Sequence, residues 1–446
     1  MSKGASARDI AFEVALAVEN DGAFANLALP RALAGSSLDT RDKAFATHLV
    51  YGALRAQGEL DAVIEEGTQR AANSLDSDVR VLLRLGCFQL LRMRVEPHAA
   101  VDETVRLAKS RQLHRVTGLV NAALRAVSAH SGEYWDRVIG QSTTSLHSHP
   151  SWIAAKIDAA LAECDGGGEL EQALTSHNEA PRVTLCHLPG FSSPDHEHAT
   201  AFSPCGEVLE GGDPTALPGV TRHHIRVQDE GSQLAALTLS RVAPWHEGER
   251  VWDMCAGPGG KTALLGAEAC DSGATVLATE LSAHRASLVE DSITAISSRF
   301  PGLIRVEIDD STKSREETFS RILLDAPCSG LGALRRRPEA RWTKKPESLP
   351  GLVELQRALL RNGLSSLAPG GFLAYVTCSP VVEETTEVVA DVLAESEGFS
   401  ALDTPTIMGS VAKTTLEGHR RGSAAQLWTH RHGTDAMFVQ MIRRDD

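Results

Sequence analysis

The stretch that most constrains this chain is residues 251–262, VWDMCAGPGGKT, where a short apolar run stops in a glycine-rich turn. The pattern predicts a strand, a loop and then an alanine-rich helix that starts near Lys261. Gly257, Gly259 and Gly260 permit positive φ and let backbone N–H groups approach a ligand at the positive end of that helix. The loop is therefore expected to hold an anionic group, either a nucleotide phosphate or the carboxylate of S-adenosylmethionine.

A phosphate-binding P-loop is the first alternative. It needs glycine, four residues and then Gly-Lys-Ser/Thr, but here the first glycine position falls on Cys255, and Pro258 lacks an N–H. ILLDAP at 322–327 could still supply a magnesium-binding aspartate. GATVLATE at 273–280 favours the other alternative, because its acid, Glu280, follows the loop by about twenty residues, where doubly wound folds bind ribose hydroxyls. A ribose-bearing cofactor is the better fit.

The composition limits what the chain can be. Its 446 residues suffice for two or three domains, and 42% hydrophobic and 23% charged residues are ordinary for a soluble protein. No apolar run reaches membrane-spanning length and the start lacks a signal peptide's order, so we expect a cytoplasmic protein without membrane association. Eight scattered cysteines without a Cys-x-x-Cys pair predict reduced thiols, and three His-x-His pairs are expected in solvated loops, with no metal site. A net charge of −14 argues against indiscriminate polyanion binding but leaves room for a local basic surface.

Three domains are expected. Alanine and leucine at helical spacing predict an all-α domain over 1–135, followed by a polar linker at 129–148. Two helical segments and the strand PRVTLCHL predict a small α/β subdomain at 149–230. Strands and helices alternate over 231–446, which predicts a Rossmann-like parallel sheet covered on both faces and closed by a C-terminal antiparallel hairpin.

Two further strand ends carry reactive side chains. RILLDAPCSG places Asp325 and Cys328 just past one strand, and FLAYVTCSP places Cys378 just past the next. Ligands of open α/β sheets lie beyond the carboxyl ends of the strands, so both thiols should face the same crevice as the glycine loop. A lone cysteine is more often a small buried hydrophobe, but two of them after adjacent strands, each beside a proline, favour catalysis.

Two thiols, an acid and S-adenosylmethionine suit methylation of carbon 5 of cytosine. That carbon is too electron-poor to attack a methyl group unless a thiolate first adds to carbon 6, and the covalent route splits one hard step in two. A second group then serves product release, while an acid beside ring nitrogen 3 stabilises developing charge. Cys378, Cys328 and Asp325 can fill these roles, and spacing alone leaves open which thiol is the nucleophile.

These motifs resemble those of known families. DMCAGPGGKT, LLDAPCSGLGALRRRPEARW and YVTCSP, in that order, are similar to the Sun-type family of RNA 5-methylcytosine methyltransferases. RDKAFATHLVYGALR, VRVLLRLGCFQLL and HAAVDETVRLAK resemble the RNA-binding NusB family. Over essentially the full length, the resemblance implies a NusB-like bundle before a methyltransferase domain, S-adenosylmethionine as cofactor and RNA, above all 16S ribosomal RNA, as substrate. A monomer is expected.

The resemblance also implies residue roles. The cysteine of the Thr-Cys motif, Cys378, is the nucleophile, and the cysteine of the Pro-Cys motif, Cys328, releases the product. DNA cytosine methyltransferases attack from their Pro-Cys motif instead, so this assignment rests on the resemblance. The implied cofactor contacts, apart from one aspartate after the third strand, are Cys255, Ala256, Gly257, Pro258, Gly259, Gly260, Lys261, Glu280 and Asp325.

For the aspartate after the third strand, the DDST stretch offers Asp309 and Asp310. Asp310 is preferred because DST best matches the family's Asp-Gly-Thr. The chain also departs from the family, with Ser311 and Ala436 where glycine is common, and both departures leave local loop geometry open.

A basic run, LRRRPEARWTKKP, lies between the two thiol stretches. Charge runs are usually solvated faces, but this run directly follows the catalytic turn and carries a tryptophan that could stack a base. RNA contact is therefore expected from Arg335, Arg336, Arg337, Arg341 and Trp342. The target cytosine must leave its stack to meet Cys378, so an unpaired or loop cytosine is the expected substrate.

Two rival functions stay open. One is a P-loop NTP-binding protein. The other is a non-catalytic NusB-like RNA-binding or antitermination factor with an idle methyltransferase fold, against which the intact Cys378, Cys328 and Asp325 speak.

Overall fold

The computed structural model describes residues 5–164 and 167–446, and the chain divides into two compact units. Unit 1 comprises Met1–Ala155, Leu174–Ala180 and Leu334–Lys344, and unit 2 comprises Lys156–Ala173, Pro181–Ala333 and Lys345–Asp446. The sequence predicts three domains. The chain instead shares the expected middle domain, 149–230, between two units, and a segment from the C-terminal half folds as part of unit 1.

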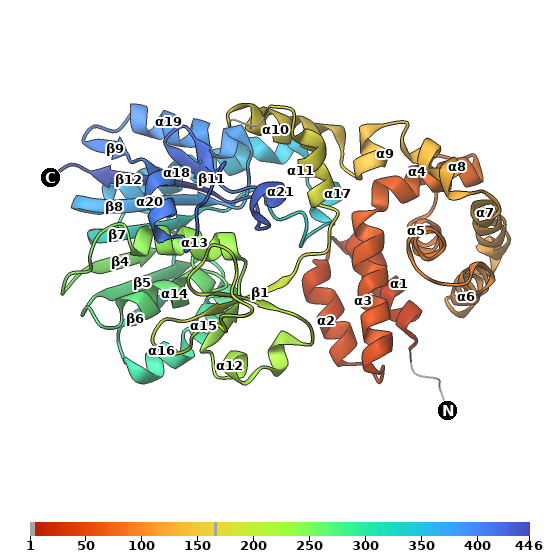
Figure 1. Cartoon of the computed structure of the whole chain (residues 1–446), viewed down its shortest axis with the longest axis horizontal. Coiled ribbons are helices and arrows are strands. Elements are labelled where there is room, and N and C mark those ends of the chain that lie inside the picture. Colours follow the sequence, from red (N-terminus) through yellow and green to blue (C-terminus); the bar gives the residue numbers. More distant parts are fainter. Residues whose placement is uncertain (1–4, 165–166) are drawn as a thin grey trace. The chain divides into compact units, whose positions relative to one another are not determined.

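Unit 1 is a helical bundle, as the alanine and leucine spacing predicts (Figure 1). Helix α5 is its centre, because residues 79–89 of this helix are almost all buried and five other helices pack around it. Arg84, whose side chain is buried within this stretch, is paired with Glu19 and Asp61. The helices up to residue 129 are α1 (Ala7–Asp21), α2 (Ala25–Ala34), α3 (Thr40–Arg55), α4 (Gln57–Thr68), α5 (Ser77–Arg92), α6 (Pro97–Ser110) and α7 (Thr117–Ala129).

The linker expected at 129–148 is helical instead. Helices α8 (Gly132–Ile139) and α9 (Thr143–His147) occupy it, and α8 buries Trp135 and Ile139 in the core of the bundle. These two large side chains lie four residues apart on one helix face, which outweighs the polar residues and glycines around them. His149, expected in a solvated loop, is also fully buried.

Unit 2 contains a small antiparallel sheet and a large mixed sheet. The small sheet has the order β2-β1-β3, with β1 (Val183–His187), β2 (Gly206–Leu209) and β3 (Ile225–Val227), and its first strand is the predicted PRVTLCHL stretch. The helices α10 (Ser151–Ala162) and α11 (Leu170–Ser176), which precede it in the chain, confirm the two helical segments expected there.

The large sheet has nine strands, and its five parallel strands follow the order β8-β7-β4-β5-β6 (Figure 1). The chain therefore starts at the central strand β4, moves outward through β5 and β6, and returns to the other side of β4 with β7 and β8. Ligands of such sheets lie beyond the carboxyl ends of the strands where this order reverses, here β4 and β7. The bounds are β4 (Arg250–Asp253), β5 (Thr275–Glu280), β6 (Ile304–Ile308), β7 (Phe319–Asp325) and β8 (Leu367–Thr377).

The predicted C-terminal hairpin is confirmed. Strand β12 (Phe438–Arg444) runs antiparallel to β8 and to β11 (Ala424–Gln426), and the short strands β9 (Phe399–Ala401) and β10 (Arg420–Arg421) complete this edge.

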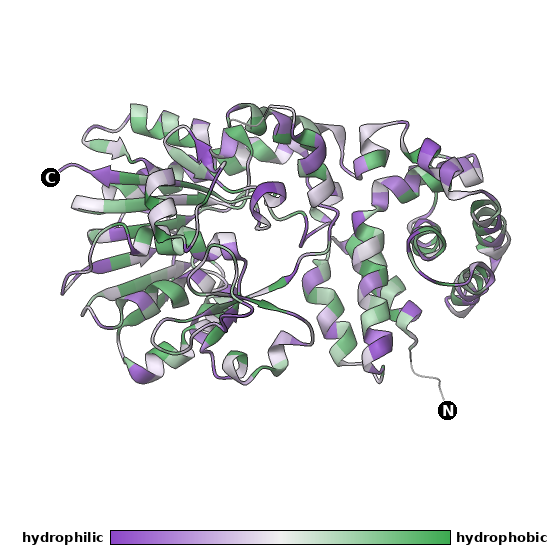
Figure 2. Ribbon diagram, in the orientation of Figure 1, coloured by the Kyte–Doolittle hydropathy of each residue, from purple (hydrophilic) through white to green (hydrophobic). Residues whose placement is uncertain are grey.

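Both faces of the parallel sheet are covered, so its strands are largely hydrophobic along their length (Figure 2). Val251 and Leu323 pack in one core with α13 (Glu230–Ser240) and α14 (Gly260–Ala269). Their chain neighbours Trp252 and Ile322 pack in the core on the opposite face, with α18 and α19. The remaining α-helices are α12 (Pro218–Thr221), α15 (Ala283–Ser292), α16 (Thr294–Arg299), α17 (Ala340–Thr343), α18 (Leu349–Ser365), α19 (Thr386–Ala394), α20 (Thr404–Val411) and α21 (Thr429–His432).

Over the ranges 5–164 and 167–446, no helix combines the length and apolar character needed to cross a membrane.

Candidate active site

The glycine loop joins the end of β4 to the first turn of α14, as the sequence predicts, and the expected contacts at 255–261 all lie on it. Gly259 has φ +102° and caps the N-terminus of α14. At Gly257, an added Cβ would lie 2.5 Å from Glu280 Oε2, so a side chain here would displace the Glu280 carboxylate from the loop. The loop thus brings bare backbone to the start of a helix, where N–H groups favour an anion.

Glu280 ends β5 and holds this loop with a side chain that is 5% exposed. Its Oε2 accepts a hydrogen bond from the N–H of Gly257 at 3.1 Å, and its Oε1 accepts one from Ser282 at 3.1 Å. Arg285 Nη2 lies 3.4 Å from Oε2. A carboxylate has about four acceptor sites. Glu280 can therefore shape the loop and still accept ribose hydroxyls, so the residues present fit a ribose-bearing cofactor.

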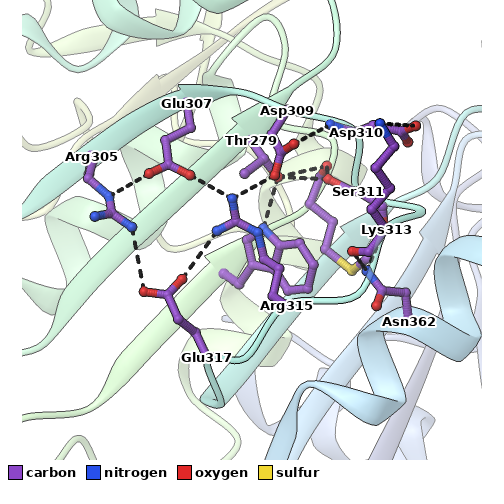
Figure 3. Close-up of polar contacts among 12 residues, drawn as sticks. Thr279, Arg305, Glu307, Asp309, Asp310, Ser311, Lys313, Arg315, Glu317 and Asn362 are labelled. Carbon is purple, nitrogen blue, oxygen red and sulfur yellow. Dashed lines mark hydrogen bonds and ion pairs between the residues drawn. The ribbon is translucent and has the colours of Figure 1, made fainter.

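The two aspartates after β6 are held differently (Figure 3). Asp309 accepts hydrogen bonds from Arg315 Nη2 at 2.6 Å and from the N–H of Asp310 at 2.9 Å, which engages both of its oxygens. Asp310 uses Oδ1 for the N–H and hydroxyl of Thr312, at 3.1 and 2.7 Å, while Lys313 Nζ is 3.9 Å from its Oδ2. These bonds lower the pKa of both carboxyls. Asp309 fixes the segment, and Asp310 keeps an oxygen for a ligand.

Ser311, one of the departures from the family pattern, has a buried hydroxyl with two partners. It donates to the carbonyl of Met254 at 2.6 Å and lies 2.8 Å from the Thr279 hydroxyl, while Asn362 donates to its carbonyl at 2.8 Å (Figure 3). The serine side chain therefore ties the end of the third parallel strand to the start of the glycine loop. The geometry that the sequence left open here is set by polar contacts.

The other departure, Ala436, donates its N–H to the carbonyl of Gly332 at 2.9 Å. An added Cβ at Gly332 would lie 2.1 Å from the Ala436 carbonyl. The close approach of the two segments therefore requires glycine at position 332 but not at position 436.

Cys328 follows β7 and Cys378 follows β8, and the structure brings their sulfur atoms to 3.5 Å from each other. The two strands pair in parallel with Asp325 opposite Val376, so equivalent turns leave the sheet side by side. Both cysteines are half-buried. The sequence predicted one crevice for both thiols, and the sulfurs do meet.

The environment keeps a proton on Cys328. The hydrogen bond with Cys378, burial, and the negative charge of Glu384 all raise the pKa of the Cys328 thiol well above its ordinary value. A thiol can both donate and accept a hydrogen bond, so either sulfur can be the donor of this pair.

Lys261, on the first turn of α14, forms an ion pair with Asp325, Nζ to Oδ2 at 2.8 Å. Burial is the largest single effect and lowers the pKa of Lys261, but Asp325, with smaller contributions from Cys378 and Asp253, outweighs it and raises the pKa overall, so the ammonium form persists. The sequence predicted Lys261 only as a cofactor contact. The signal for the pair is the sheet order, because β4 and β7 are neighbours and each is followed by a polar side chain.

The basic run folds as part of unit 1, and this corrects the prediction for Arg341. Arg341 is 0% exposed, and its guanidinium donates to four oxygens of the unit. These are the carbonyls of Arg55, Ser148 and His177, at 3.1, 3.1 and 2.7 Å, and Asn178 Oδ1, at 2.6 Å. No part of this side chain is left to contact RNA. Its charge instead fastens the segment to the bundle.

The other members of the run divide between burial and exposure. Arg335 is 9% exposed, and Trp342 is half-buried with its ring against Gly58 of α4. Arg336 and Arg337 are exposed. Of the five residues expected to contact RNA, these two have exposed side chains.

An exposed aromatic residue that the sequence analysis did not single out lies beside Arg337. The Phe24 ring is 52% exposed, and the Arg337 guanidinium lies 5.8 Å from its centroid. Leu27, one helical turn further along α2, is 65% exposed. Apolar residues at the start of a helix usually belong to the core, so the sequence held no signal for their exposure. We call Phe24, Leu27, Arg336 and Arg337 the Phe24 surface.

Within the described residues, 5–164 and 167–446, no group of three or more His, Cys, Asp or Glu side chains could hold a metal ion.

The fold and the site are those of an RNA methyltransferase. A family model described as 16S rRNA methyltransferase RsmB/F matches residues 241–443, and the NusB family model matches residues 5–129. Ribosomal RNA small subunit methyltransferase B of Pseudomonas putida is 33% identical, over 88% of this chain and 90% of that protein. A Mycobacterium tuberculosis protein with a provisional methyltransferase name is 42% identical, over 98% of this chain and 96% of that protein. This chain therefore belongs to the RsmB/F family of 16S rRNA methyltransferases, with a NusB-family domain in front.

A solved structure agrees on the fold. The match with the crystal structure of PH0851 covers 98% of this chain and 98% of the PH0851 chain, with a TM-score of 0.79 at 20% sequence identity.

Proposed function

We propose that this protein transfers a methyl group from S-adenosylmethionine to carbon 5 of an unpaired cytosine in 16S rRNA, through a transient bond between Cys378 and carbon 6. The observation that carries the proposal is the 3.5 Å separation of the Cys328 and Cys378 sulfurs, at the same edge of the sheet as the Lys261–Asp325 pair. Methylation of an oxygen or nitrogen needs no such thiols, because a lone pair is already nucleophilic. Relatives named ribosomal RNA small subunit methyltransferase B support the choice of RNA.

The cofactor would bind across the ends of β4, β5 and β6. S-adenosylmethionine supplies an electrophilic methyl group when it is bound. In the proposed arrangement, the glycine loop binds its carboxylate, Glu280 accepts from the ribose hydroxyls, and Asp310 accepts from the adenine amino group. The pairing of Asp309 with Arg315 favours Asp310 over its neighbour for this last role.

In the proposed reaction, the Cys378 thiolate adds to carbon 6, and the π electrons of the ring make carbon 5 a nucleophile. The charge that builds up at ring nitrogen 3 is negative, so the Lys261–Asp325 pair would pass a proton through Asp325 to nitrogen 3 and take it back when the bond to Cys378 breaks. Transfer of the methyl group to carbon 5 would leave S-adenosylhomocysteine. Carbon 5 then loses its proton to water, and the electrons of that C–H bond re-form the double bond to carbon 6 and expel Cys378 as a thiolate. The Cys328 thiol donates a hydrogen bond to the departing sulfur, in line with its raised pKa.

RNA would contact the Phe24 surface of unit 1. Two exposed arginines can bind phosphates, and an exposed aromatic ring can stack an unpaired base. The Phe24 surface replaces Arg341 and Trp342 as the expected RNA contact, because those two side chains face into unit 1. It also explains how a chain with a net charge of −14 could bind a polyanion, because the basic groups are gathered locally.

A ligand titration tests the cofactor. S-adenosylmethionine should raise the melting temperature of the protein, since a ligand that binds only the folded state stabilises it. Magnesium ATP should leave it unchanged. A shift with magnesium ATP alone would favour the P-loop alternative.

A transfer assay tests the product. Single turnover with methyl-labelled cofactor on 16S rRNA should put label on carbon 5 of cytosine, and bisulfite mapping of ribosomal RNA from cells with and without the protein should locate the nucleotide. No label in RNA would leave the idle, RNA-binding alternative.

A further inference from the structure

Glu384 is a buried carboxylate that the reaction described above does not use. It lies at the end of the short 3-10 turn Val382–Glu384, seven residues after the end of β8, and is 0% exposed. Its Oε1 accepts from the N–H of Ser329 at 2.7 Å and from Gln356 Nε2 at 3.1 Å. Its Oε2 accepts from the hydroxyls of Ser329 and Ser379, at 2.5 and 2.6 Å. Removing a carboxylate from water costs free energy, and here four hydrogen bonds offset that cost. Such an arrangement suggests that the buried carboxylate has a specific role.

The partners of Glu384 stand next to the two thiols. Ser329 directly follows Cys328, and Ser379 directly follows Cys378. The two serine hydroxyls also lie 3.0 Å from each other, so both meet at the same carboxylate oxygen. One side chain is therefore bonded to the neighbour of each cysteine.

A third connection passes through Gln356 on α18. The same Nε2 that donates to Glu384 donates to the carbonyl of Pro327 at 2.8 Å, so the Pro-Cys turn is held on both sides of Cys328. Tyr375, on β8, donates its hydroxyl to the backbone carbonyl of Glu384 at 2.8 Å and so fixes the carboxylate relative to the Thr-Cys turn. The two cysteine turns and α18 share one polar centre.

We infer that Glu384 is a positioning residue that sets the distance between the two thiols by holding both cysteine turns in one hydrogen-bonded cluster. The inference rests on the proposed function for its consequence in catalysis, but its geometric content, a thiol pair kept in register by a carboxylate, stands apart from it. Glu384 touches neither substrate nor cofactor in this account and acts through Ser329 and Ser379.

A carboxylate is suited to this task because each of its oxygens accepts two hydrogen bonds. An alanine would leave the Ser329 N–H and both hydroxyls short of a partner in a buried place, and each such group carries a desolvation cost. A glutamine keeps one carbonyl oxygen and offers its NH₂ group to hydroxyls that can turn round and accept. The negative charge of Glu384 also contributes to the raised pKa of Cys328, so it supports the thiol form there.

The first experiment compares Glu384→Ala and Glu384→Gln with Glu383→Gln. Glu383 is the adjacent carboxylate, pairs with Lys156 and touches neither cysteine turn, so it is a matched control. Glu384→Ala should slow single-turnover methyl transfer by about 10²-fold with unchanged affinity for S-adenosylmethionine, because small misplacements of reacting groups cost about this much. Glu384→Gln should fall between it and the wild type, and the control should match the wild type. Equal rates for Glu384→Ala and the wild type would overturn the inference.

A second pair of variants covers the case in which Glu384→Ala does not fold. Ser329→Ala and Ser379→Ala each remove one hydroxyl from the cluster. Each should slow transfer several-fold, and their effects should not add, because both act through the same carboxylate. Effects that add fully, or no effect of either, would contradict a shared centre.

The closing experiment measures the thiol pair without any reaction. Phenylarsine oxide binds tightly where two thiols can bridge one arsenic atom, so its affinity reports how well the two sulfurs are held together. Wild type and Glu383→Gln should bind it equally, Cys328→Ser should lose the tight site, and Glu384→Ala should bind at least tenfold more weakly. If Glu384→Ala binds as tightly as the wild type, Glu384 does not set the thiol geometry. Because this assay uses no RNA and no methyl donor, a failure of the proposed function would leave its result intact.

Discussion

The basic run lies between the two cysteine turns in the chain, yet the run and the turns are organised by different rules. The turns follow neighbouring parallel strands of unit 2, and their sulfurs meet at 3.5 Å. The run begins only six residues after Cys328 but folds into unit 1, where Arg341 is fully buried. In the turns, sheet topology decides where side chains go. In the run, the position of a side chain depends on whether the helical bundle offers oxygen atoms that can accept hydrogen bonds from its charge.

This difference separates reactivity from attachment. The thiols are half-buried and placed by strands on which the whole unit depends. The arginines look equivalent in the sequence but have different roles. Arg341 holds the segment to the helical bundle, whereas Arg336 and Arg337 are exposed. Substitutions in the two regions should therefore differ in kind, with losses of chemistry in one and losses of stability or RNA affinity in the other.

The largest effect is expected in the Thr-Cys turn. Cys378→Ala should lower methyl transfer by about 10⁴-fold or more, because removal of a nucleophile abolishes the covalent route. Affinity for S-adenosylmethionine should not change, since the cofactor residues lie on other strands. Transfer assays and calorimetric titration measure the two quantities. A variant that keeps its activity would remove Cys378 from the chemistry.

The Pro-Cys turn should respond differently from the Thr-Cys turn. Cys328→Ala removes the donor to the departing sulfur and should slow turnover by roughly 10² to 10⁴-fold, within the range of acid–base assistance. Protein bonded to RNA should then accumulate, visible as a slow band on a denaturing gel, and Cys378→Ala should show none. If the two variants exchange these phenotypes, the roles of the thiols are reversed.

The buried arginine of the basic run should give a loss of stability without a loss of chemistry. Arg341→Met leaves four buried oxygens without their donor, and we expect the free energy of unfolding of unit 1 to fall by about 3 kcal/mol. Denaturation followed by a probe in unit 1 measures this. A stable Arg341→Met variant with weakened RNA binding would restore the prediction made from the sequence.

The exposed arginines should give the smallest effect and the opposite pattern. Arg336→Ala with Arg337→Ala should leave the melting temperature unchanged and weaken RNA binding by roughly 20-fold at 0.1 M salt, since each phosphate contact on a single strand contributes about 0.7 to the salt slope. Phe24→Ala should weaken binding by about 1 to 3 kcal/mol without a change in slope, as expected for a stacking contact. An unaltered salt slope in the arginine variant would exclude the Phe24 surface as a phosphate-binding site.

The sequence was informative where local pattern and sheet topology determine structure. The glycine loop, the alternating strands, the terminal hairpin and the meeting of Cys328 with Cys378 all follow from periodicity and from the rule for strand ends. The resemblance alone supplied the separate roles of the two thiols, because the 3.5 Å contact between the sulfurs is compatible with either role for each.

What the sequence could not give depends on long-range packing. Nothing local in LRRRPEARW separates Arg341 from Arg336, because burial comes from Arg55, Ser148 and His177, each more than 150 residues away. The same holds for Trp135, whose helix looks like a polar linker until the bundle is assembled around it. Glu384 also lies outside any motif used above, and only the contacts with Ser329 and Ser379 mark it.

The most direct test of the central claim traps the bond to Cys378. RNA in which the target cytosine carries fluorine at carbon 5 can accept the thiolate and the methyl group, but it cannot lose a proton from carbon 5, so the adduct should persist. Digestion and mass spectrometry of the trapped complex should find the modified nucleotide on the peptide that contains Cys378. A nucleotide attached to Cys328, or methylated RNA without any protein adduct, would contradict the account.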